Sequence, residues 1–121
     1  MEQFVTFNIG KKLKEKGFIH DYNLYGYKPI YTDVNTIALI WNNGAYEKDY
    51  FGENIPCPTI SQVLKWLREE KKIHIGVLYH NYYAVWIQPM KRNEAEHVIH
   101  DCKTHEGAEL EGIEFVLDNL I

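Results

Sequence analysis

The sequence predicts an α+β domain in which an antiparallel sheet of about three strands packs against helices. Between residues 58 and 79 the apolar residues change from helical spacing to alternation, which indicates a helix that runs almost directly into a strand. Residues 82–88 are predicted to form a second strand in a hairpin with the first, and residues 104–120 return to helical spacing. With residues 94–102 as a third strand, the C-terminal order is α-β-β-β-α.

Length and composition favour one globular domain over residues 1–121. Apolar residues make up 45% and aromatic residues 14% of the 121 positions, so a core of ordinary size is expected. We expect a helix and a tyrosine-rich irregular region in residues 1–57, and the α-β-β-β-α unit in residues 58–121.

The composition also argues against several classes of protein. Apolar runs such as Ile37–Trp41 are far too short to cross a bilayer, and no secretory signal is recognisable. Two cysteines, Cys57 and Cys102, form no disulfide framework, which favours a reducing cytoplasm. A net charge of −4 argues against a protein that coats nucleic acid or anionic membrane.

The first element is predicted to be a helix from about Thr6 to Lys16. Thr6 is a suitable N-cap for this helix. Gly17 supplies the left-handed residue that commonly follows a helix, and Phe18 is then placed to contact Leu13 in a Schellman ending.

Residues 19–57 are predicted to be mainly turns and irregular structure. Tyrosines here alternate with Gly, Pro, Asn and Asp, the residues that favour turns. Thr36–Trp41 is the exception, because its β-branched and apolar residues predict a short buried strand. The tyrosines of the region are Tyr22, Tyr25, Tyr27, Tyr31, Tyr46 and Tyr50.

A capped helix and a hairpin are predicted next. Thr59 and Gln62 have the spacing of a capping box. Strands Ile73–Tyr79 and Tyr82–Gln88 are expected to turn at His80-Asn81, a two-residue loop. This register puts Ile73, Ile75, Val77, Tyr79, Tyr82, Ala84 and Trp86 on a face that packs on the helices.

The opposite face of that hairpin is the predicted interaction surface. It is not polar throughout, so it should be covered by the Ile37–Trp41 segment or by a partner chain. Its candidate contact residues are His74, Leu78, Tyr83, Val85 and Ile87.

Residues 94–102 fit two structures from sequence alone. Asn93 and Glu96 are spaced as a capping box for a helix, whereas His97–Cys102 fits a third strand equally well. Thr104 is predicted to cap the last helix. Gly112 within that helix suggests close contact with another backbone.

Parts of the chain resemble small uncharacterised proteins encoded by phages, prophages and mobile elements of gut bacteria. The resemblance lies in Pro58-Thr59, Lys65-Trp66-Leu67-Arg68-Glu69, Ile73-His74-Ile75-Gly76-Val77, Lys11–Phe18 and the Thr-capped acidic segment Thr104–Ile113. The chain departs from the pattern at Gly107, where such proteins usually carry an acidic residue. The resemblance implies no activity and no catalytic residues, and it favours a strand over residues 97–102.

The strongest chemical lead is a set of four candidate metal ligands, His97, His100, Cys102 and His105. In a regular strand His100 and Cys102 would share a face and His97 would point away, whereas in a helix Cys102 would join the apolar stripe. A three-ligand site that includes His105 is the remaining possibility. Because the four residues do not converge in either structure, no bound metal is expected. Motifs for phosphate, nucleophile-elbow or zinc-protease sites do not occur, and no cofactor is expected.

Other reactive or aromatic residues are interpreted as structural. Cys57 and Cys102 lack the setting that lowers a thiol pKa, so neither is expected to be a nucleophile. Trp66 and Trp86 lie on or beside apolar faces and are expected in the core. The tyrosines lack the interleaved Lys and Arg of a nucleic-acid stacking surface.

The α-β-β-β-α order resembles a double-stranded-RNA-binding domain, but the last helix begins with Glu106 and carries Glu109 and Glu111, which would repel RNA. An acidic last helix beside a sheet also resembles the antitoxin of small toxin–antitoxin pairs. The sequence therefore predicts a non-enzymatic cytoplasmic accessory protein that binds protein, either itself or a partner chain. Nucleic-acid binding is the first alternative and a metal-dependent enzyme the second.

Overall fold

The computed structural model describes residues 3–18, 27–31, 36–41, 55–79, 81–91 and 94–121. The chain divides into two compact units, an N-terminal unit of residues Phe4–Thr59 and a C-terminal unit of Met1–Gln3 with Ile60–Ile121. Among the described residues, no helix has both the length and the apolar content that crossing a bilayer requires.

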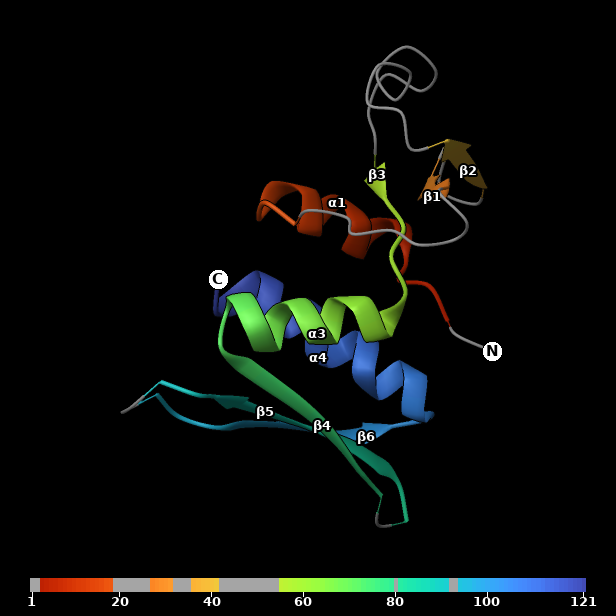
Figure 1. The fold of residues 1–121 in the computed structure, drawn as a ribbon. Helices are drawn as coiled ribbons and strands as arrows, with labels where there is room; N and C mark the ends of the chain where they lie inside the picture. The colour runs from red at the N-terminus through yellow and green to blue at the C-terminus, as the bar shows by residue number, and fades with distance from the viewer. Residues whose placement is uncertain (1–2, 19–26, 32–35, 42–54, 80, 92–93) are drawn as a thin grey trace. The chain divides into compact units, whose positions relative to one another are not determined.

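The C-terminal unit has the predicted α+β architecture and the predicted α-β-β-β-α order. Its sheet is antiparallel with strand order β4-β5-β6, and helices α3 and α4 lie together on one face (Figure 1). The described residues put no helix of this unit on the other face. Its elements are α3 (Ile60–Glu70), β4 (Ile73–Tyr79), β5 (Tyr83–Pro89), β6 (His97–Cys102) and α4 (His105–Asn119).

The N-terminal unit contains a second antiparallel sheet, which the sequence analysis missed. Its strand order is β2-β1-β3, and β2 is the strand predicted near residues 36–41. The prediction of irregular structure was wrong for β1 and β3, while Tyr22, Tyr25, Tyr46 and Tyr50 lie outside the described residues. The elements of this unit are α1 (Phe7–Glu15), β1 (Tyr27–Tyr31), β2 (Ile37–Trp41) and β3 (Ile55–Pro56).

Tyr31 explains why a tyrosine-rich segment can form a strand here. Its ring is buried in a cluster with Ile55 and Cys57 and meets the Phe7 ring edge-on at 5.6 Å. Its hydroxyl donates a hydrogen bond to the Val5 carbonyl. The ring therefore fills the core of this unit while its polar end is satisfied.

Helix α1 begins and ends as predicted. The Thr6 hydroxyl accepts a hydrogen bond from the Ile9 N–H at 3.3 Å. At the other end Gly17 has φ of 82°, and the Phe18 N–H reaches the Leu13 carbonyl at 3.0 Å, the long bond of a Schellman motif. Both ends depend only on neighbouring residues, which is why sequence predicts them.

The last helix also starts at its predicted cap, because the Thr104 hydroxyl accepts from the Gly107 N–H at 2.9 Å. Helix α3 begins directly after Thr59, and its capping box with Gln62 stays a prediction. Gly112 of α4 makes the expected close approach, but to side chains and not to a backbone. A Cβ on it would lie 2.7 Å from Val85 Cγ2 and 3.2 Å from Ile75 Cγ2.

Candidate interaction surface

The register of the β4–β5 hairpin decides which residues can form a surface. Tyr79 lies opposite Tyr83, so the loop has three residues, 80–82, and not the predicted two. Asn81 takes φ of 65°, which allows the extra residue. The two-residue prediction therefore assigned every residue of the second strand to the wrong face.

Three of the five predicted contact residues consequently do not lie on the predicted surface. Val85 and Ile87 are 0% exposed, and with Tyr83 they belong to the face of the sheet that carries the helices. His74 and Leu78 remain on the helix-free face. Trp86, which was expected to be in the core, lies on the helix-free face as well, opposite Gly76.

A β-bulge at the end of β6 changes the positions of the candidate metal ligands. Ile99 pairs with Val85, but Cys102 pairs with Tyr83, so β6 contains one extra residue, and Asp101 has φ of 64°. As a result, His97 and Cys102 both face α4. The prediction that Cys102 shares a face with His100 and opposes His97 was wrong, because it assumed a regular strand.

The histidines and Cys102 do not meet at a common point. His97 packs on Phe115 of α4 with ring centroids 5.0 Å apart, whereas His100 lies 6.0 Å from the Tyr82 ring. His105 is paired with Glu109 at 3.2 Å. Within the described residues, no three His, Cys, Asp or Glu side chains are arranged to hold a metal ion.

We call the helix-free side of the β4-β5-β6 sheet the open face. Exposed apolar side chains lie on it, with Leu78 55% exposed, Val98 46% and Tyr82, in the hairpin loop, 41%. Residues on adjacent strands pair across it, as Trp86 does with Val98. Its members are His74, Gly76, Leu78, Tyr82, Ala84, Trp86, Gln88, Val98 and His100.

The open face contains no Lys or Arg and no carboxylate among its members. Its polar groups are the side chains of His74, His100 and Gln88, the Tyr82 hydroxyl and the Trp86 indole. The indole N–H donates to the Glu96 carboxylate at the margin at 3.1 Å. The His74 ring meets Trp86 edge-on at 6.2 Å. This surface is uncharged, aromatic and partly apolar, which is the composition of a protein-binding patch.

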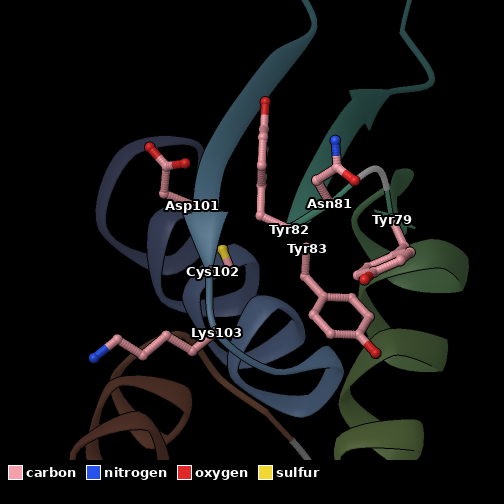
Figure 2. A pocket seen from close by; sticks show the side chains of 7 residues that line it. All are labelled: Tyr79, Asn81, Tyr82, Tyr83, Asp101, Cys102 and Lys103. Carbon is pink, nitrogen blue, oxygen red and sulfur yellow. The ribbon is translucent and has the colours of Figure 1, made fainter.

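A hollow of about 450 Å³ lies where the hairpin loop meets the end of β6 (Figure 2). Its lining includes three tyrosines, but their rings do not converge: Tyr82 extends to one side, whereas the rings of Tyr79 and Tyr83 lie together at 4.8 Å. The lining residues are Tyr79, Asn81, Tyr82, Tyr83, Asp101, Cys102 and Lys103.

The thiol in this hollow is unsuited to nucleophilic chemistry. Cys102 is only 4% exposed, and its Sγ donates to the Glu111 carboxylate at 3.2 Å. Burial, and then the nearby Glu111 carboxylate, raise the pKa of Cys102 to about 11. The thiol is therefore protonated at neutral pH, whereas attack requires a thiolate.

The start of α4 is acidic, as the sequence indicates. Glu106 lies in its first turn, and burial raises the pKa of Glu109, an effect that the His105 imidazole opposes. Helix α4 carries no Lys or Arg. The position at which double-stranded-RNA-binding domains place phosphate-binding cations therefore carries negative charge here.

Sequence reasoning missed Tyr82, Trp86, Val98 and His100 as members of one surface. Their assignment needs the loop length and the bulge, and the only local signal for the loop was Asn81, a residue that tolerates the left-handed conformation. Comparison with family models, curated proteins and solved structures finds no match to this chain.

Proposed function

We propose that this chain is a non-enzymatic accessory protein that binds another protein through the open face. The observation that carries the proposal is the set of exposed apolar side chains, Leu78, Val98 and Tyr82, that share one sheet face with Trp86. Apolar exposure of this kind costs free energy in water, which burial against a partner would recover.

Chemistry at the two described cysteines supports a binding role over catalysis. Cys57 and Cys102 are buried free thiols, and burial raises the pKa of each to about 11. Free thiols are also consistent with the cytoplasmic location that we include in the proposal. The resemblance to phage and mobile-element proteins favours a regulatory or antitoxin-like role for the contact.

The open face also favours a protein partner over nucleic acid. A surface that binds phosphates needs cations along the backbone path, and the open face has none. Its apolar and aromatic residues instead match the centre of a protein interface.

The proposal is tested by placing a charge in the middle of the open face. Val98→Lys adds one positive charge at an exposed position, so the free energy of unfolding should change by no more than about 0.5 kcal/mol. Host proteins that bind the wild type but not Val98→Lys are identified, and the one that the wild type retains most strongly is purified. Calorimetry should show binding to the wild type with a negative heat-capacity change, weakened about tenfold or more by the substitution.

The matched control is Asn119→Lys, which adds the same charge at an exposed position near the end of α4. This variant should bind the purified partner like the wild type. A partner that binds Val98→Lys and the wild type equally would contradict the proposal, and so would wild-type protein that retains only nucleic acid.

A further inference from the structure

The two edges of the β4-β5-β6 sheet differ in how they are protected. Edge strand β6 carries the bulge and the charged Asp101, both of which discourage pairing with another strand. Edge strand β4, Ile-His-Ile-Gly-Val-Leu-Tyr, pairs with β5 without a break over all seven residues and contains no Lys, Arg, Asp, Glu or proline. Among the described residues, no strand pairs with its outer side.

The backbone groups that β4 presents to this free edge follow from the β4–β5 ladder. The Met90 N–H donates to the Lys72 carbonyl at 2.8 Å, one step beyond the pair Ile73–Pro89. Because hydrogen-bonded and non-hydrogen-bonded pairs alternate in antiparallel sheets, His74, Gly76 and Leu78 bond to β5. Residues 73, 75, 77 and 79 therefore direct their N–H and C=O groups outward.

We propose that β4 pairs with β4 of a second copy of this chain, antiparallel and centred on Gly76. In this register Ile73 pairs with Tyr79 of the second copy, and Ile75 pairs with Val77. It is the only antiparallel register that satisfies all four outward-facing residues of both copies. Gly76 then faces Gly76 of the second copy as a non-hydrogen-bonded pair.

Strand β4 can pair with β4 of a second copy because the side chains that would lie opposite each other are compatible. Neither copy brings a Lys, Arg, Asp or Glu to the paired strand, so no like charges oppose each other across the twofold axis. On the helix side the cross-strand pairs are apolar or aromatic. The axis is perpendicular to the sheet, so the helices of both copies lie on one side and the open face becomes continuous over six strands.

A substitution at Gly76 tests this pairing directly, because a Cβ can be accommodated at that position in the single chain. A Cβ on Gly76 would lie 3.6 Å from His74 Nε2 and 3.7 Å from Trp86 Cε3, which are ordinary contact distances. In the paired state two such side chains would lie directly opposite each other. Gly76→Glu should therefore repel itself, Gly76→Lys likewise, and Gly76→Gln has the size of the glutamate without its charge.

Sedimentation velocity and light scattering over a concentration series measure the result. The wild type and Gly76→Gln should form dimers, whereas Gly76→Glu and Gly76→Lys should each raise the dimer Kd about tenfold or more. Mixing the two charged variants should restore dimers as heterodimers. That rescue also shows that both variants fold.

Three results would overturn the inference. The first is a wild type that stays monomeric at about 100 µM, where a Kd in the micromolar range would already give dimers. The others are dimers of Gly76→Glu that are as tight as those of Gly76→Gln, and a mixture of the charged variants that forms no heterodimer. The surface is the strand edge and not the open face, so Val98→Lys should leave the dimer intact. Loss of the dimer in Val98→Lys alone would likewise contradict edge pairing.

Discussion

Two buried cysteine thiols, one in each unit, should make the stability of the protein depend on pH. Cys57 is fully buried beside Tyr31, and Cys102 is buried against Glu111. Burial raises the pKa of each thiol from 9.0 to about 11. The nearby Tyr31 hydroxyl opposes the rise in pKa at Cys57, whereas the Glu111 carboxylate adds to it at Cys102.

We predict that stability falls as the pH rises from about 9 to about 11. In this range the unfolded chain releases the thiol protons first, so the unfolded state binds fewer protons than the folded one and the free energy of unfolding declines with pH. A shift of this size contributes roughly 1–3 kcal/mol for each thiol. Urea unfolding followed by circular dichroism at pH 7, 9, 10 and 11 measures the decline.

Cys102→Ala separates this effect from the titration of other groups. The variant should be less stable at pH 7 because the Glu111 carboxylate loses its donor. It should nevertheless lose less stability between pH 9 and 11 than the wild type does. Equal losses in the two proteins would show that Cys102 keeps an ordinary pKa.

At the scale of elements, helix α4 approaches the sheet closely at Gly112. Gly112 approaches the fully buried Val85, and both Val85 and Ile75 are β-branched residues with little freedom to move aside. A glycine inside a helix costs about 1 kcal/mol relative to alanine. The close approach is the reason that this helix accepts the cost.

Gly112→Ala is therefore expected to destabilise the protein, although alanine favours the helix. Overpacking against Val85 costs roughly 1–3 kcal/mol, which exceeds the gain in helix propensity and leaves a net loss of about 1 kcal/mol. Urea unfolding provides the measurement. In a Val85→Ala background the same substitution should be neutral or stabilising, and additive losses across this double-mutant cycle would contradict the mechanism.

At the scale of the whole molecule, the distribution of charge argues against nucleic-acid binding. Helix α4 contains no Lys or Arg to balance its acidic residues, which are Glu106, Glu109, Glu111, Glu114 and Asp118. Lys11, Lys12, Lys14 and Lys16 gather in and just after α1, in the other unit. The unit with the α-β-β-β-α order is thus the one with the acidic terminal helix.

We predict no specific binding to duplex RNA or DNA at physiological salt. Any residual binding at about 50 mM salt should depend on the lysines near α1 and disappear as salt rises, because phosphate contacts weaken with ion concentration. Fluorescence anisotropy with labelled duplexes at two salt concentrations tests this. Micromolar or tighter binding at about 150 mM salt would contradict this prediction and favour the nucleic-acid alternative instead.

Local chemistry explains which parts of the fold were predictable. Thr6, Gly17 and Thr104 act on backbone groups within a few residues, so their roles follow from sequence. The change of period between α3 and β4 is similarly local. The α+β class and the C-terminal order were therefore confirmed, whereas β1 and β3 were missed because turn-forming residues surround them.

Strand β6 shows why the candidate site was harder to predict. Its inward residues, His97, Ile99 and Cys102, are two and then three positions apart because of the bulge. This spacing matches the period of neither a regular strand nor a helix. The sequence pattern therefore does not decide between the two structures. The three-residue loop has the same effect on β5, where one extra residue reverses the face of every side chain.

By itself the sequence determined the fold class, the order of the C-terminal elements, the N-caps of α1 and α4 and the absence of common catalytic motifs. Tertiary structure alone decided which residues share a surface, because a loop length and a single bulge set the strand register, and register depends on long-range pairing. For the same reason Val85 and Ile87 left the predicted interaction surface, and Tyr82, Trp86, Val98 and His100 joined it.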